Sequence, residues 1–223
     1  MDIIRSTEAD ARTHIDQIPD LIYATGPASY GYQFGSRTVF DPLVRASWMV
    51  PHTLFGHDAA ALALDGGELL GVELGFISPG FRERADALAQ VWPTIGEYAE
   101  LDARDQALLT GLGTRVHECS WLNPTIPSDT YYVFALSVVD EHRGEGVGAA
   151  LLRHALDQAR SNGASGLQLD VLSDNPAVDF YRAHGLEVLV ESKAPIPFSN
   201  GVPIELRMGV RFESSSDENQ EER

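Results

Sequence analysis

The feature that most constrains the fold is a β-prone run that passes through a glycine-rich loop into an amphipathic helix. Residues 130–139, TYYVFALSVV, are typical of a strand. The loop that follows contains Gly144, Gly146 and Gly148. Apolar residues at helical spacing then predict a helix over about 146–161. Backbone amides of such a loop and the N-terminus of the helix can together bind an anion such as a pyrophosphate.

The overall charge makes an anion site unexpected. The chain has 16 Lys and Arg against 33 Asp and Glu, which gives a formal net charge of −17. An acidic surface argues against nucleic acid and anionic membranes as partners and favours cationic ones, although solubility alone would also explain it. A loop of amides works by short-range hydrogen bonds, so the two observations are compatible if the acidic side chains of the loop face solvent.

The order of predicted elements indicates a single α/β domain over residues 1–212. Seven strands are expected, in residues 2–5, 59–64, 69–77, 130–139, 166–172, 186–192 and 202–210. Helices are expected over 8–24 with an interruption at Pro19, over about 41–50, over 146–161 and over 176–184. Residues 25–35 and 193–201 are expected to be loops.

Two segments stand apart from this pattern. Residues 78–129 are too long for a plain connection between strands and predict a helical insertion, with helices near 80–92 and 95–111. Residues 213–223 are polar and charged, and we expect an acidic, disordered tail. No run is apolar enough to span a bilayer, no secretory signal is visible, and Cys119 is the single cysteine, so we expect a cytoplasmic protein.

Two other interpretations of the glycine loop stay open. Gly144-x-Gly146-x-x-Ala149 fits a loose dinucleotide fingerprint, and Asp170 ends a strand about twenty residues later, where a ribose-binding acid would lie in a Rossmann-type enzyme. Against this, residues 140–143 separate the strand from the first glycine. The loop could also be a turn that binds no ligand.

Two motifs together resemble the GNAT superfamily of acyl-CoA-dependent N-acetyltransferases. VVDEHRGEGVGAALL (138–152) looks like the pyrophosphate-binding motif of that family, and NPAVDFYRAHGLEVL (175–189) looks like its next motif. The resemblance implies a mixed central sheet of about seven strands flanked by helices, with the helical insertion between the third and fourth strands. It also implies acetyl-CoA as cosubstrate and no metal.

The resemblance assigns roles to individual residues. The backbone of Val138 and Val139 would pair with the pantetheine arm, Asn175 would hydrogen-bond it, and Tyr181 would protonate the departing thiolate. The pyrophosphate would be held by five backbone amides, those of Arg143, Gly144, Gly146, Val147 and Gly148. Each residue also has a structural alternative, because valines fill strands, Asn before Pro caps helices, and tyrosine packs in cores.

The general base is the least certain element of the site. Many relatives have a glutamate three residues before the equivalent of Val138, and this chain has Ala135 there. Glu73 is the first substitute, on a predicted strand and on the side shared with two glycines, although a solvent-exposed position is equally compatible with the pattern. Glu118 is the second candidate. His117-x-Cys119 is only half of a metal-binding pattern.

These observations predict an N-acetyltransferase that moves an acetyl group from acetyl-CoA to a primary amine of a small molecule or peptide. The acceptor is expected to be cationic and to contact residues 25–35, with aromatic Tyr30, Tyr32 and Phe34, and residues 193–201. The second hypothesis is a catalytically degenerate acyl-CoA sensor or scaffold, and the third is the Rossmann-type enzyme. A homodimer is compatible with the sequence.

Overall fold

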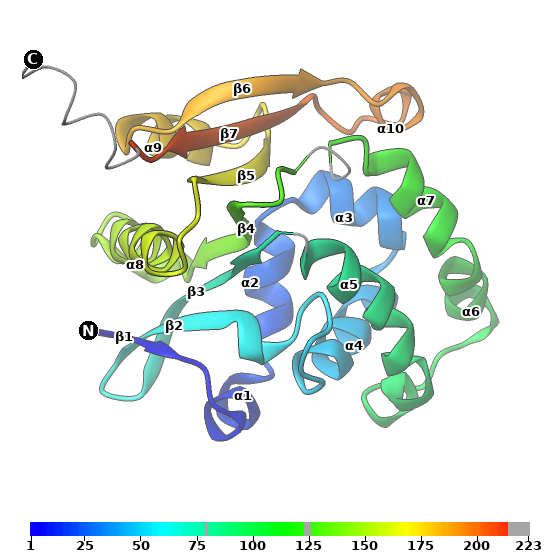
Figure 1. Ribbon diagram of the computed structural model, residues 1–223. Helices are drawn as coiled ribbons and strands as arrows, with labels where there is room; N and C mark the ends of the chain where they lie inside the picture. Colours follow the sequence, from blue (N-terminus) through cyan, green and yellow to red (C-terminus); the bar gives the residue numbers. More distant parts are fainter. Residues whose placement is uncertain (79, 123–125, 214–223) are drawn as a thin grey trace, which may run out of the picture.

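The computed structural model describes residues 1–78, 80–122 and 126–213. Its centre is a seven-stranded mixed sheet in the order β1-β2-β3-β4-β5-β7-β6 (Figure 1). The strands are β1 (Asp2–Arg5), β2 (Ala60–Asp65), β3 (Glu68–Ile77), β4 (Thr130–Val138), β5 (Gly166–Leu172), β6 (Glu187–Ser192) and β7 (Glu205–Arg211). Within the described residues, only β4 and β5 pair in parallel. A largely antiparallel sheet excludes the doubly wound parallel sheet of the Rossmann alternative.

Helices cover both faces of this sheet. The N-terminal ones are α1 (Glu8–His14), α2 (Ile18–Ala24), α3 (Pro27–Phe34) and α4 (Arg37–Trp48), followed by the 3₁₀ turn η1 (His57–Ala59). Between β3 and β4 lie α5 (Gly80–Ala87), the 3₁₀ segment η2 (Leu88–Glu97), α6 (Ala103–Thr110) and α7 (Leu112–Cys119). The C-terminal part contributes η4 (Asp140–His142), α8 (Val147–Ser161), α9 (Ala177–Ala183) and α10 (Pro195–Ser199).

The strands agree with the sequence prediction, whereas several helices differ from it. Residues 8–24 form two helices, and Thr7 begins the first with a capping box closed by Asp10. Residues 25–35 and 193–201 were expected to be loops, and each contains a helix, α3 and α10. In both, a proline occupies the first turn, where its missing amide costs nothing.

The helices between β3 and β4 are also more broken than expected. The predicted helix over 80–92 ends as an α-helix at Ala87, and η2 continues it in 3₁₀ geometry around Pro93. The predicted helix over 95–111 begins only at Ala103, because Asp102 supplies the N-cap and forms a capping box with Asp105. Most of the predicted tail, from residue 214 on, lies outside the described residues.

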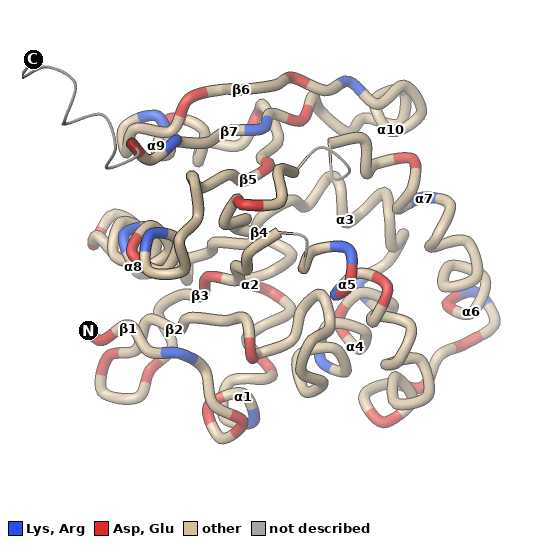
Figure 2. Tube along the Cα trace, viewed as in Figure 1, with Lys and Arg blue, Asp and Glu red and all other residues tan. Residues whose placement is uncertain are grey.

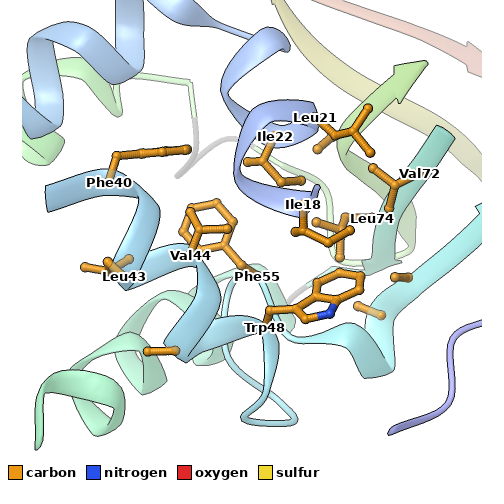
Figure 3. Packing of buried hydrophobic residues seen from close by; sticks show 14 of the residues in the cluster. Ile18, Leu21, Ile22, Phe40, Leu43, Val44, Trp48, Phe55, Val72 and Leu74 are labelled. Atoms are coloured by element: carbon orange, nitrogen blue, oxygen red, sulfur yellow. The ribbon is translucent and has the colours of Figure 1, made fainter. Parts of the chain in front are cut away.

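The larger core lies between the N-terminal helices and one face of the sheet. Figure 3 shows apolar side chains of α2 and α4 pointing toward β3, with Trp48 beneath Ile18 and Phe55 among them. Trp48 is fully buried, and its indole N–H donates to the carbonyl oxygen of Ala11 at 3.1 Å. This bond satisfies the polar atom of a buried ring and links α4 to α1.

The opposite face of the sheet is covered mainly by α8 and α9. Leu152 and Ala155 of α8 are fully buried against strand residues such as Val133 and Leu169. The helix therefore presents one apolar stripe to the sheet, as its 3.6-residue spacing predicts.

β4 and β5 separate partway along their length, and this separation positions the site. Their parallel pairing ends at Val133 and Leu169, although β4 runs on to Val138 and β5 to Leu172. A β-bulge lies at the same point, because Leu74 pairs with Ala135 and Gly75 with Val133, which leaves Phe134 as the extra residue of β4. A bulge bends its strand and increases its twist, so β4 turns away from β5 here.

Charged residues are distributed over most helices and strands (Figure 2). No helix in the described part of the chain is both long and apolar enough to cross a membrane.

Candidate active site

A cavity of about 1440 Å³ occupies the gap between β4 and β5. Residues Tyr132 to Val138 line it from β4, and Leu169 to Leu172 line it from β5. At one end it reaches residues 142–148, which we call the glycine-loop end. At the other it reaches Asp170, Glu205 and the side chains around them from α3, α7 and β4, which we call the carboxylate end.

The glycine-loop end has the backbone geometry that a pyrophosphate would need. Gly144 and Gly146 have φ angles of 84° and 87°, in the left-handed region that favours glycine. A Cβ atom at either position would meet no atom within 4 Å, so conformation rather than crowding accounts for these glycines. Gly146 is the N-cap of α8 and offers no side chain to its first-turn amides, which leaves them available to a ligand.

The predicted amides are not equally available. The amide of Arg143 already donates to the carbonyl oxygen of Asp140 at 3.3 Å, and its guanidinium pairs with the Asp140 carboxylate at 2.7 Å. Val147 begins α8 with its side chain buried in the core, so only its amide can contribute. Gly148 faces the cavity, and a Cβ there would lie 3.6 Å from both Phe180 and Val138.

The two valines of β4 also differ from one another. The amide of Val139 donates to the carbonyl oxygen of Leu70 at 2.9 Å, so β3 already uses it. Because successive residues of a strand turn their amides to opposite edges, the backbone of Val138 faces the gap left by β5. The carbonyl oxygen of Val138 accepts only a long hydrogen bond from Nε of Arg143, at 3.4 Å. Within the predicted pair, Val138 is therefore the residue whose backbone faces the gap, and Val139 is not.

Asn175 lines the cavity with both ends of its side chain in use. Its Oδ1 accepts from the amide of Ala177 at 2.9 Å, at the start of α9, and its Nδ2 donates to the carbonyl oxygen of Thr25 at 3.3 Å. The capping alternative therefore describes contacts that this side chain makes. Its predicted bond to pantetheine stays a prediction, for which Nδ2 has a second hydrogen.

Tyr181 lies on α9 with its side chain buried and lining the cavity. Burial raises the pKa of its phenol well above the ordinary value. Among the described residues, no hydrogen-bond partner is found for its hydroxyl. A phenol that stays protonated and lacks a protein partner can donate its proton to a ligand in the cavity.

Glu73 does not line the cavity. Its side chain is fully buried on the face of the sheet covered by α8, where the hydroxyl of Tyr131 donates to Oε1 at 3.2 Å and Oε2 has no partner among the described residues. A Cβ on Gly75 would collide with Glu73 and Tyr131, so the space that the small residue leaves is filled by these two side chains rather than by a ligand. Burial raises the pKa of Glu73 to about 8, opposed by the Tyr131 hydrogen bond.

The carboxylate end is organised by a buried ion pair. Arg207 of β7 donates through Nε and Nη2 to the two oxygens of Asp170 on β5, at 2.8 and 2.7 Å. The hydroxyl of Tyr132 donates to the same carboxylate at 2.9 Å, and Arg207 also donates to the carbonyl oxygen of Leu122. The side chains of Arg207 and Asp170 are 2% and 6% exposed, so this bidentate pair is fixed in a low-dielectric environment.

Glu205 lies beside that ion pair and was absent from the sequence prediction. It begins β7, pairs in register with Leu172 of β5 and lines the cavity. Burial and the charge of Asp170 raise its pKa to about 8, and Arg207 opposes the shift. The strand VPIELRMGV contains it as a charged residue between apolar ones, which is a weak signal because such a residue on an isolated strand usually faces solvent.

Two of the three aromatic residues of α3 line the cavity and also pack in the core. Tyr30 and Phe34 line the cavity and also pack on Phe40, with ring centroids 4.9 Å away in both cases. Tyr32 lies outside the cavity lining, and its hydroxyl donates to Glu118 at 2.5 Å, so this pair joins α3 to α7. Glu118 is thereby engaged in a structural contact away from the cavity.

Comparison with solved structures supports the fold. An N-acetyltransferase from Staphylococcus aureus Mu50 superposes with a TM-score of 0.68 and 14% identity, covering 94% of this chain and 100% of that one. The protein named SsHAT gives a TM-score of 0.58 with 20% identity over 96% of this chain and 98% of that one. At these identities the likeness concerns the fold alone.

Sequence comparison adds the family. A streptothricin acetyltransferase of Streptomyces lavendulae is 47% identical over 51 residues, which are 22% of this chain and 27% of that protein. An L-2,4-diaminobutyric acid acetyltransferase of Nocardia farcinica is 33% identical over 79 residues, which are 35% of this chain and 36% of that protein. The match thus spans only about a third of these relatives. The profile of the acetyltransferase (GNAT) family matches residues 51–186, more than half of the chain. The protein therefore belongs to the GNAT acetyltransferase family, as its two motifs predicted.

Proposed function

We propose that the protein transfers an acetyl group from acetyl-CoA to a primary amine of a small molecule or peptide. The observation that carries this proposal is one continuous cavity that joins a loop of free amides, the open edge of β4 and a pair of carboxylates. The pyrophosphate of an acyl donor fits the loop amides, and the extended arm of the donor fits the edge of β4. An ammonium group fits the carboxylates. One of the two relatives named above is named for L-2,4-diaminobutyric acid, which is an amine, and this supports the acceptor class.

The chemistry assigns tasks to the residues of the cavity. The open backbone of Val138 holds the pantetheine arm as an added strand, and the amides of Gly144, Gly146 and Gly148 hold the pyrophosphate. The amine attacks the thioester carbonyl carbon, and backbone amides of β4 near the bulge stabilise the oxyanion. The C–S bond then breaks, and the Tyr181 hydroxyl donates its proton to the thiolate.

The experiment has a binding part and a turnover part. In calorimetric titrations, acetyl-CoA should bind, whereas NAD and S-adenosylmethionine should not. A panel of L-2,4-diaminobutyric acid, streptothricin and a short peptide with a free α-amine is then incubated with acetyl-CoA, and released thiol is measured. Absence of acetyl-CoA binding would reject the proposal.

A second candidate function is that of an acyl-CoA sensor or scaffold without turnover. The observation that favours it is Ala135, which lines the cavity where many relatives have a glutamate. Tight acetyl-CoA binding with no thiol release above background across the amine panel would support the sensor and reject the enzyme.

A further inference from the structure

We propose that Glu205 is the general base that removes the proton from the acceptor amine. This inference rests on the proposed function, since it names the residue that makes amine acetylation possible in a chain with Ala135 on β4. Acetyl transfer needs a neutral amine, and an ordinary alkylamine is protonated at neutral pH, with a pKa of about 10.4.

The first argument is position. The register of β5 and β7 places Glu205 opposite Leu172, at the end of β5 where that strand has separated from β4. The side chain lines the cavity, and its surroundings come from three further elements, with Tyr30 on α3, Cys119 on α7 and Tyr132 on β4. Cys119 and Glu205 also line a second, small cavity together with Leu172, so α7 and β7 meet at this point.

The second argument is that the other carboxylates of the cavity are either bound by an arginine or exposed to solvent. Four carboxylates line the cavity within the described residues: Asp86, Asp170, Asp174 and Glu205. Both oxygens of Asp170 are engaged by Arg207, and one also accepts from Tyr132, so the neighbouring guanidinium favours the charged form of Asp170 and makes it a weak base. Asp86 and Asp174 are exposed to solvent, whereas Glu205 is mostly buried and has no ion-pair partner among the described residues.

The third argument is charge. The facing charges of Asp170 and Arg207 cancel in their bidentate pair, which leaves Glu205 as the buried carboxyl group at this end of the cavity that has no ion-pair partner among the described residues. On the side of β6 and α10, its neighbours Ser192, Ala194 and Pro197 are uncharged. Burial and Asp170 hold the pKa of Glu205 near 8, so its deprotonated form is a stronger base than an exposed carboxylate and, when formed, attracts an ammonium group.

The proton balance is complete with this assignment. The ammonium group R–NH3⁺ gives one proton to the Glu205 carboxylate, and the nitrogen lone pair forms the N–C bond. As the C–S bond breaks, the thiolate gains a proton from Tyr181, and the second proton lost by the nitrogen restores the Tyr181 phenol. The products are R–NH–CO–CH3, CoA–SH and one proton that Glu205 releases to solvent.

The test compares Glu205→Gln with Glu187→Gln, the same change at an exposed residue of the neighbouring strand β6. With the best amine of the panel, Glu205→Gln should lower kcat at least 100-fold and leave the Kd of acetyl-CoA within twofold. The kcat of the wild-type protein and of Glu187→Gln should rise with pH around 8, since the base acts when deprotonated, and this rise should be missing in Glu205→Gln.

A second substrate distinguishes two roles of Glu205, that of a general base and that of a residue that only maintains the shape of the cavity. The difluorinated analogue of the same amine, with both fluorines on the carbon next to the CH2–NH2 group, is much less basic and largely uncharged above about pH 8, where both substrates are compared. Loss of a base should therefore cost this substrate less than tenfold, whereas a distorted cavity should cost both substrates equally. Equal losses, or full turnover by Glu205→Gln, would overturn the assignment of Glu205 while leaving the function intact. If wild-type protein fails to bind acetyl-CoA or to acetylate any amine, the proposed enzyme function itself is rejected.

Discussion

The two ends of the cavity are built in different ways. The glycine-loop end consists of backbone groups from one continuous segment, residues 138–148, and depends on φ angles that glycine permits. The carboxylate end consists of side chains from α3, α7, β4, β5 and β7, which are separated by up to 175 residues from Tyr30 to Glu205. Binding of a common donor can thus be encoded locally, whereas acceptor chemistry depends on how distant elements pack. The predictions below test this division.

The largest effect is expected between the two ends, at Tyr181. Tyr181→Phe keeps the buried ring and removes the proton, so kcat should fall by about 10² or more while the Kd of acetyl-CoA stays within twofold. Tyr98→Phe, at a tyrosine outside the cavity lining, is the control. Steady-state kinetics and calorimetry provide both numbers, and full turnover by Tyr181→Phe would mean that the ring only packs.

The next largest effect is expected at the glycine-loop end. Gly146→Asp adds a negative charge and a strained left-handed residue at the start of α8, so the affinity for acetyl-CoA should fall at least tenfold, about 1.4 kcal/mol. Gly163→Asp makes the same change at the other end of α8, with a φ of 71° and equally open surroundings. Equal affinities of the two folded variants for acetyl-CoA would show that this loop does not bind the pyrophosphate.

A third prediction separates the two buried glutamates. Glu73 and Glu205 both have a pKa raised to about 8, but only Glu205 lines the cavity. We therefore expect the kcat of Glu73→Gln to stay within about threefold of the wild-type value, whereas replacement of the general base would lower kcat far more. A 100-fold loss of kcat in Glu73→Gln would restore Glu73 as the candidate base.

The same variant should change stability with a defined sign. Between the unfolded pKa of 4.5 and the folded value near 8, folded Glu73 retains a proton that the unfolded chain loses, so stability of the wild-type protein falls as pH rises. Gln cannot ionise. The free energy of unfolding of Glu73→Gln, relative to that of the wild-type protein, should therefore increase from pH 5 to pH 8, by up to about 1.4 kcal/mol per pH unit. Urea unfolding at both pH values measures it, with Glu187→Gln on β6 as the exposed control.

The smallest effect concerns the net charge of −17. Salt shortens the Debye length from about 10 Å at 0.1 M to about 3 Å at 1 M, which weakens attraction of a cationic amine and repulsion of anionic acetyl-CoA. The KM of the amine should therefore rise by about two- to fivefold while that of acetyl-CoA falls or holds. Removal of residues 213–223 should alter these slopes only slightly. A flat or falling amine KM would indicate a neutral or anionic acceptor.

The sequence alone determined those features of the protein that depend on residues close together in the chain. Patterns of apolar and β-prone residues identified the strands, and the glycines with the following helix predicted the glycine-loop end, because φ preferences and helix N-termini act over a few residues. The helices Pro27–Phe34 and Pro195–Ser199 were missed, since a proline, glycine and aromatic composition is typical of loops. Packing of Tyr30 on Phe40 is a tertiary contact that stabilises the first of them.

Only the tertiary structure decided which glutamate reaches the cavity. Glu73 and Glu205 are both single acids in apolar strands, and the sequence favoured Glu73 because Gly71 and Gly75 flank it. In the fold, the Gly75 side of β3 packs under α8, while the pairing of β7 with β5 carries Glu205 to the open end of the sheet. Strand order and the face that each helix covers depend on contacts between residues far apart in the chain, and no local preference encodes them.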